Sequence, residues 1–155
     1  MSRVVAGLVA IVLHYQPALP RSEAVTWARG VVVASERFDI DPELIAAVVT
    51  LESRWRPNLV TPNHGGCAVG LIQYQIPVRG ICGPCLRGIS HCPDRVRRML
   101  VPRRNLAGGA SILASKRRIA ASRGIRPFWA LYNWGQPRYV TWIETSLARV
   151  RRYTR

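Results

Sequence analysis

The sequence predicts a single all-α domain that carries an irregular, cysteine-rich insert. The chain has 155 residues, of which 48% are apolar, so it is long enough for one hydrophobic core and too apolar for a disordered chain. Apolar residues recur at helical spacing along much of the chain, and no period-two alternation is long enough to indicate a sheet. There is no internal repeat and no linker that would divide the chain into two domains.

Residues 1–20 have the composition of a secretory signal. Arg3 precedes a run of apolar or small residues over 4–13, and a helix-breaking stretch that ends at Pro20 follows. A short positive start and an apolar region of ~7–15 residues are typical of export signals. The alternative is an apolar helix or strand packed on the domain. We expect residues 1–20 to be a signal peptide or N-terminal anchor, residues 21–155 to form the domain, and the protein to be exported to the periplasm or cell envelope.

Capping and packing residues support the individual helices. Helices are expected over residues 22–37, from 41 to just before Pro57, and over 105–121, 128–134 and 139–152. Ser22 can cap the first helix. Asp41 is a favourable N-cap for the second, and Pro42 suits its first turn. The pair Gly108 and Gly109 indicates that the third helix packs closely against a neighbour.

The positive charge of the chain lies in its second half. The chain has 23 basic and 8 acidic residues, a net charge of +15. Residues 1–78 hold six arginines and six acids, whereas residues 79–155 hold 17 basic residues and two acids. A field of this sign favours a polyanionic partner, which composition leaves open between nucleic acid, an anionic envelope polymer and a membrane surface.

Glu52 differs from the other carboxylates of the chain. It follows Ile45 and Val49 at helical spacing, which places it beside the apolar side of its helix, in the last turn. Burial and the helix dipole would both raise the pKa of this carboxyl, as a general acid near neutral pH requires. The alternative is a structural ion pair with Arg54, Arg56 or another arginine, and position alone leaves the two open.

Four segments in order resemble the motifs of the lytic transglycosylase family, whose catalytic domain has a lysozyme-like fold. They are residues 41–53, a helix that ends in Glu-Ser; residues 68–73, Ala-Val-Gly-Leu-Ile-Gln; Asn105 with Gly109 and Leu113; and residues 130–135, Ala-Leu-Tyr-Asn-Trp-Gly. Each motif alone is weak, but their common order is fairly specific. The resemblance covers residues 22–145 and implies a lysozyme-like single domain.

The resemblance also implies roles for five residues. Glu52 would be the single catalytic acid and base. Ser53 would help to hold the substrate or the carboxylate, and Gln73 would hydrogen-bond the bound sugar. Tyr132 would orient Glu52, and Asn133 would support that side of the cleft.

Several features depart from the family pattern, among them Ile72, which replaces the usual Met. Residues 63–66, Asn-His-Gly-Gly, lengthen the spacing from Glu52 to Gln73 by about three residues relative to the family's common pattern, where a tighter turn is usual. One residue too many separates Gln73 from Pro77, so Gln75 competes with Gln73 for the sugar contact. Trp134 occupies a position that is usually small.

The activity that the resemblance implies is that of a peptidoglycan lytic transglycosylase, which needs no metal or organic cofactor. Such an enzyme cleaves the β-1,4 bond between N-acetylmuramic acid and N-acetylglucosamine without water and leaves a 1,6-anhydromuramic end. No second carboxylate has an obvious place beside Glu52, although most glycosidases need two. One alternative is a goose-type lysozyme that hydrolyses the same bond. The other is a basic, zinc-stapled module that binds nucleic acid.

We expect this protein to act as a monomer on peptidoglycan glycan strands. Its arginines would hold it to anionic polymers of the envelope, and no nucleic-acid partner is expected.

Four cysteines, Cys67, Cys82, Cys85 and Cys92, fall in or next to the insert over residues 78–104. In an exported protein two disulfides are the simplest reading, with three connectivities open, while zinc binding and free thiols are the alternatives.

Overall fold

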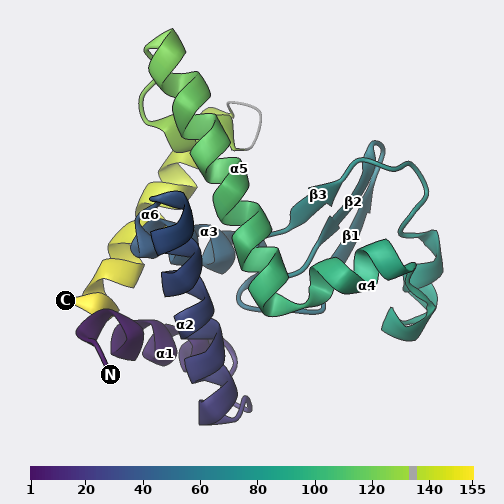
Figure 1. Ribbon diagram of the computed structural model, residues 1–155, viewed down its shortest axis with the longest axis horizontal. Coiled ribbons are helices and arrows are strands. Elements are labelled where there is room, and N and C mark those ends of the chain that lie inside the picture. Colours follow the sequence, from purple (N-terminus) through teal and green to yellow (C-terminus); the bar gives the residue numbers. More distant parts are fainter. Residues whose placement is uncertain (133–135) are drawn as a thin grey trace.

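The computed structural model describes residues 1–132 and 136–155, and helices make up most of it (Figure 1). The predicted all-α class is therefore confirmed. The α-helices are α1 (Arg3–Tyr15), α2 (Arg21–Phe38), α3 (Pro42–Ser53), α4 (Asp94–Leu100), α5 (Pro102–Arg123) and α6 (Pro137–Thr154). The strands are β1 (Val60–Asn63), β2 (Gly66–Val69) and β3 (Tyr74–Ile76), and 3₁₀ turns are η1 (Gly83–Arg87), η2 (Ile89–His91) and η3 (Phe128–Leu131).

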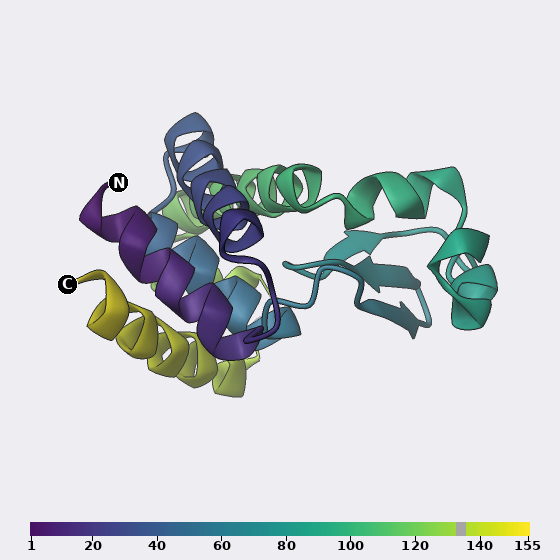
Figure 2. The same ribbon diagram turned by 90° about the horizontal axis from the view of Figure 1, so that it is seen from below.

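Helix α3 is the centre of a helical body formed with α1, α2, α5 and α6 (Figures 1 and 2). All residues from Leu44 to Thr50 are buried, so α3 is covered on every side rather than along one stripe. The predicted N-cap is confirmed, because Oδ1 of Asp41 accepts a hydrogen bond from the backbone N–H of Glu43 at 2.8 Å. Ser22 does not cap α2, since the helix already begins at Arg21 after Pro20.

Helix α1 packs into the same core as the rest of the helical body. Val5, Leu8, Val9, Ile11 and Val12 are buried in the cluster that also contains the central helix. At Gly7 an added Cβ would lie 2.3 Å from the backbone oxygen of Tyr153, so α1 and α6 approach at backbone contact. Figure 2 shows the two helices side by side. In this structure residues 3–15 are therefore an apolar helix packed on the domain.

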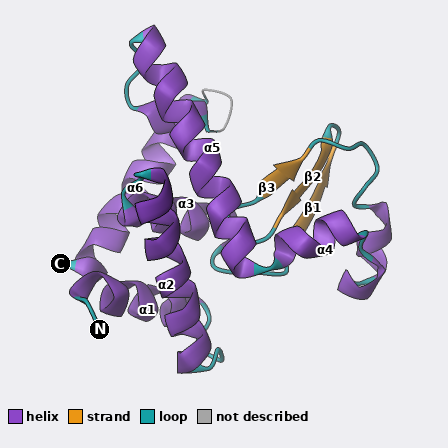
Figure 3. Ribbon diagram, viewed as in Figure 1, coloured by secondary structure: helices purple, strands orange, loops and turns teal. Residues whose placement is uncertain are grey.

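The three strands form an antiparallel sheet that the sequence pattern did not predict (Figure 3). Two strands have four residues and the third has three, too few for a period-two alternation to be visible. The residues that lengthen the spacing from Glu52 to Gln73 form the turn between β1 and β2, where Asn63 pairs with Gly66. The extra length therefore extends a hairpin.

The sheet, η1, η2 and α4 together form a lobe beside the helical body, here called the sheet lobe (Figure 1). Its own small core contains Val69, Ile76, Val96 and Leu100 together with three of the cysteines. Residues 78–93 are irregular apart from the 3₁₀ turns, as expected, but the end of the insert is helical in α4. The reason is local: Asp94 stands in the first turn after Pro93, and two apolar residues of α4 face the lobe core.

Two disulfides cross-link the sheet lobe. Cys67 is bonded to Cys82 and Cys85 to Cys92, which selects one of the three connectivities. Because all four sulfurs are used, none is free to bind zinc as a thiolate.

Asn105 joins the sheet lobe to the helical body. This fully buried amide accepts a hydrogen bond from the backbone N–H of Ile72 at 2.8 Å and donates to the carbonyls of Val69 and Met99 at 2.8 and 2.9 Å. The close packing expected at the glycine pair is confirmed, because an added Cβ on Gly109 would lie 2.4 Å from the side chain of Ile72. Helix α5 therefore fixes the position of the loop after β2.

None of the helices in the described part of the chain is long and apolar enough to span a bilayer.

Candidate active site

Glu52 lies in the last turn of α3, where the chain turns sharply. The next residues, Arg54 and Trp55, both have left-handed backbone conformations, with φ of 52° and 61°. Trp55 is fully buried, and its indole N–H donates to the hydroxyl of Thr50 at 3.0 Å, which anchors the turn under the helix. This anchoring leaves Glu52 half-buried at the end of the helix, next to the sheet lobe.

Arg56, four residues after Glu52, binds a backbone oxygen instead of its carboxylate. The guanidinium of Arg56 donates to the carbonyl of Ser53 at 3.0 Å, and the backbone N–H of Arg56 donates to the same carbonyl at 3.2 Å. The side-chain amide of Gln16 donates at 2.9 Å to the carbonyl of Arg54, which the helix end would otherwise leave unpaired. No cation lies within 4.0 Å of the Glu52 carboxylate in residues 1–132 and 136–155, so the ion-pair alternative is not the arrangement found.

The hydroxyl of Tyr139 donates a hydrogen bond of 2.6 Å to Oε1 of Glu52. Burial raises the pKa of Glu52 above its ordinary value of 4.5, and this hydrogen bond opposes part of the rise. Burial, followed by the negative charge of Glu52, raises the pKa of Tyr139 far above its ordinary value. Tyr139 therefore keeps its proton and remains a donor, while Glu52 can be protonated nearer neutral pH than a solvated glutamate.

Tyr132 supports the site indirectly, through its contacts with Ile72 and Tyr139. Its hydroxyl donates to the carbonyl of Ile72 at 3.0 Å, and its ring stacks on that of Tyr139 with centroids 6.2 Å apart. The resemblance implied that Tyr132 would orient Glu52, and in this structure the hydrogen bond to the Glu52 carboxylate comes from Tyr139. The reason is the fold: η3 brings Tyr132 to the loop after β2, whereas α6 runs alongside α3 and carries Tyr139 to the carboxylate.

Gln73 lies in the loop between β2 and β3, and three hydrogen bonds hold its side-chain amide. Its amide N–H groups donate to the carbonyls of Gly70 at 3.0 Å and Leu59 at 3.3 Å, and its Oε1 accepts from Thr61 at 2.8 Å. Its φ of 49° is a strained value for a residue with a side chain, and such strain is common at functional sites. Since both donors are occupied, its free capacity is one lone pair on Oε1, which suits a sugar hydroxyl.

The other predicted residues differ in what surrounds them. Ser53 is buried, and its hydroxyl donates to the carbonyl of Val49 within α3 at 3.2 Å, as helix-interior serines commonly do. Gln75 is exposed on β3, and its side-chain oxygen accepts a hydrogen bond of 2.9 Å from the amide of Asn63, at the end of β1 on the other side of β2. Asn133 lies outside the described residues.

Comparison with protein families gives one match: the model described as the transglycosylase SLT domain covers residues 31–153. The chain belongs to this family. Comparisons with curated proteins and with solved structures gave no match. Membership of the SLT family confirms the lysozyme-like fold, assigns the chain to the transglycosylases, and makes peptidoglycan, outside the cytoplasm, its substrate.

Tyr139 is the residue of this SLT domain that sequence reasoning missed. It begins the apolar spacing Tyr139, Ile143, Leu147 and Val150 on α6, a pattern that indicates only a residue of the core. Its hydroxyl can be recognised as a candidate for the site only when the carboxylate that it contacts is known. A buried tyrosine near the start of a helix usually needs a hydrogen-bond partner, and that was the one available signal.

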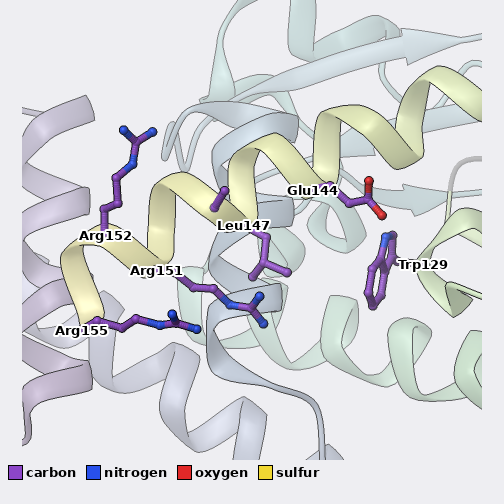
Figure 4. Close-up of a pocket in the computed structure, with 7 residues that line it drawn as sticks. Trp129, Glu144, Leu147, Arg151, Arg152 and Arg155 are labelled. Atoms are coloured by element: carbon purple, nitrogen blue, oxygen red, sulfur yellow. The ribbon is translucent and has the colours of Figure 1, made fainter.

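A pocket of about 680 Å³ lies along the SLT domain's last helix, apart from Glu52, Gln73 and Tyr139 (Figure 4). Its lining residues are Trp129, Glu144, Leu147, Ala148, Arg151, Arg152 and Arg155. Arg151 is already paired with Glu43 at 3.0 Å, and arginines at a helix C-terminus are favoured by the helix dipole. We therefore interpret Arg151 as a structural partner of Glu43 on α3.

We expect Tyr139→Phe to shift the pH dependence of the SLT domain's activity. Without the hydroxyl the pKa of Glu52 rises further, so the carboxyl stays protonated to higher pH. The falling limb of kcat/KM moves to higher pH, and kcat drops about ten-fold or more because the carboxyl loses its orientation. Tyr153→Phe, which removes an exposed hydroxyl from the same helix, is the control. An unchanged falling limb in Tyr139→Phe would show that Tyr139 does not tune Glu52.

Proposed function

We propose that this protein is a peptidoglycan lytic transglycosylase in which Glu52 acts first as general acid and then as general base. The observation that carries the proposal is a half-buried carboxyl with a raised pKa, held by the Tyr139 hydroxyl and with no cation within 4.0 Å among the described residues. A general acid needs a proton at working pH and a fixed orientation. Desolvation supports the first requirement, and the hydrogen bond supports the second.

In the first step the protonated Glu52 donates its proton to the glycosidic oxygen between N-acetylmuramic acid and N-acetylglucosamine. The bond from C1 of the muramic acid to this oxygen breaks, and the N-acetylglucosamine side leaves with a hydroxyl group. The carbonyl oxygen of the muramic 2-acetamido group stabilises C1 from the opposite side. Glu52 is now a carboxylate, and the hydrogen bond from Tyr139 stabilises this charge.

In the second step the Glu52 carboxylate takes the proton of the C6 hydroxyl of the same muramic acid. The C6 oxygen bonds to C1 and displaces the acetamido oxygen, which closes the 1,6-anhydro ring. Glu52 ends the cycle protonated, and water is neither consumed nor released. Gln73 accepts a hydrogen bond from a sugar hydroxyl through the free lone pair of its Oε1, and Tyr132 supports the loop that carries Gln73.

The placement of the other carboxylates favours this reaction over hydrolysis by a goose-type lysozyme. Glu43 is bonded to Arg151 at the far end of α3, and Asp94 is bonded to Arg97 in the sheet lobe. Neither can serve beside Glu52 as the second carboxylate that most hydrolytic mechanisms use. We also propose that the protein is exported, works as a monomer without a cofactor, and uses its arginines to adhere to anionic envelope polymers.

Mass spectrometry of digested cell walls tests the proposed reaction. Purified peptidoglycan incubated with the protein is expected to release muropeptides with 1,6-anhydromuramic ends. These products are lighter by one water, about 18 mass units, than the reducing-end muropeptides that a hydrolase releases. A digest made in ¹⁸O-labelled water should contain no label at the new ends. Labelled, reducing ends would replace the proposal by the hydrolytic alternative.

A further inference from the structure

Residues 78–91, here called the tip segment, lie at the end of the sheet lobe that points away from the helical body (Figures 1 and 2). The segment leaves β3 after Ile76, which pairs with Cys67 near the β1–β2 turn, and it contains both η1 and η2. Gln73 lies at the opposite end of the same sheet, near the helical body. The tip segment is therefore separate from the candidate active site.

The tip segment presents large apolar side chains to solvent. Leu86 is 74% exposed, Ile89 40% and Val78 39%, so three of the nine exposed large apolar residues of the described chain belong to one short segment. Single exposed apolar residues are common on protein surfaces and need no explanation. Three of them fall within 14 residues of the chain, in the segment at the far end of the lobe, and are here called the apolar group.

Arginines stand near this apolar group in the sequence. The tip segment contains Arg79 and Arg87 and no acidic residue, and the helix that follows adds Arg95, Arg97 and Arg98. The one acid in the insert, Asp94, is paired with Arg97. An anionic surface that approached the tip would therefore meet uncompensated arginine charge.

Both disulfides hold the tip segment in this shape. Cys82 and Cys85 lie within it, and their partners Cys67 and Cys92 lie on β2 and immediately after η2. The buried Cys82 and Cys92 belong to the core of the sheet lobe, while Leu86, inside the short loop that the Cys85–Cys92 bond closes, is exposed to solvent. Because the backbone is already constrained, little conformational entropy would be lost on docking.

We propose that the tip segment docks on the surface of an anionic lipid bilayer, with Leu86 and Ile89 entering the boundary between headgroups and acyl chains. Apolar side chains flanked by arginine are the pattern of proteins that lie in the membrane interface. Each arginine near an anionic leaflet contributes attraction of its own. A hydrated anionic polymer would bind the arginines as well, but it would offer nothing to a leucine that is 74% exposed.

Vesicle co-sedimentation at low salt tests the proposal with the full chain. Unilamellar vesicles of phosphatidylcholine with phosphatidylglycerol are compared with vesicles of phosphatidylcholine alone. The parent is expected to sediment with the anionic vesicles and much less with the neutral ones. The double variant Leu86→Ser/Ile89→Ser should bind anionic vesicles at least about ten-fold more weakly, since burial of one leucine alone accounts for such a factor. Arg79→Gln and Arg87→Gln should each weaken binding about five-fold.

Val33→Ser is the matched control, because Val33 is 49% exposed but lies on α2 in the helical body. It should bind vesicles as the parent does, and all variants should keep the parent's thermal unfolding midpoint, since every altered side chain is exposed. The proposal is overturned if the parent does not sediment with anionic vesicles, or if Leu86→Ser/Ile89→Ser binds them like Val33→Ser. It is also overturned if the double variant loses binding to lipid-free peptidoglycan sacculi instead, which would make the tip a wall-binding surface.

Discussion

Glu52→Gln is expected to abolish digestion of purified peptidoglycan, with a rate at least about 10³-fold below that of the parent. Glutamine has the shape of the carboxylic acid and can still accept the hydrogen bond from Tyr139, but it can neither donate a proton to the glycosidic oxygen nor take one from the C6 hydroxyl. The loss of turbidity of a sacculus suspension measures the rate. Glu144→Gln, an exposed carboxyl on α6, is the matched control and should retain full activity. Residual activity within a few-fold of the parent would exclude Glu52 as the catalytic group.

We also expect Glu52→Gln to change how the stability of the folded protein depends on pH. The pKa of Glu52 is raised in the folded chain, so the parent loses stability as pH rises from the unfolded value of about 4.5 through the folded pKa. Glu52→Gln lacks this loss. Its thermal midpoint should therefore match the parent near pH 4 and exceed it near pH 8. A difference that does not grow with pH would mean that the folded protein tolerates the charge at no cost, and the argument from burial would fail.

Removal of residues 1–20 is expected to prevent stable folding. Val5, Leu8, Val9, Ile11 and Val12 are buried, and burial of each contributes about 2 kcal/mol, a sum on the order of 10 kcal/mol. That sum is comparable to the entire stability of a domain, which is about 5–15 kcal/mol. A chain that begins at Arg21 should therefore show no cooperative thermal transition by circular dichroism.

A single substitution tests the contribution of α1 to the core with a smaller expected loss of stability. Leu8→Ala should cost about 3 kcal/mol and lower the thermal midpoint by roughly 6–12 °C, whereas Ala10→Ser on the exposed face of α1 should change it little. If the chain from Arg21 instead unfolds cooperatively at the parent's midpoint and digests peptidoglycan, α1 is dispensable. The export signal expected over residues 1–20 would then be the correct interpretation.

Local signals in the sequence were sufficient where one residue or one turn decides the structure. Asp41 and Pro42 located the start of α3, because capping depends on a backbone N–H two residues away. The glycine pair in α5 indicated a close approach, because only glycine permits it. Glu52 was singled out by its place in a helix, although the choice between a catalytic carboxyl and an ion pair rested on the resemblance to the family.

The sheet and the surroundings of Glu52 could not be predicted in the same way. Strands of three or four residues have too few positions for a period-two alternation to be visible. Here the hydrogen bonds between neighbouring strands and the Cys67–Cys82 disulfide hold them. Tyr139 stands 87 residues from Glu52 in the chain, and nothing local marks it as the partner in place of Tyr132. Contacts of this kind follow from how helices pack, which depends on the whole chain.

By itself, the sequence determined the helical class, the family, the central carboxylate and the concentration of positive charge in the second half of the chain. These properties are local or compositional, so they are present in the chain before it folds. Tertiary structure alone decided that Tyr139 holds Glu52, that α1 belongs to the core, which cysteines pair, and that Leu86 protrudes from a cationic tip. Each of these depends on burial or on a distance between residues remote in the chain, and neither quantity exists until the helices and the sheet lobe have packed together.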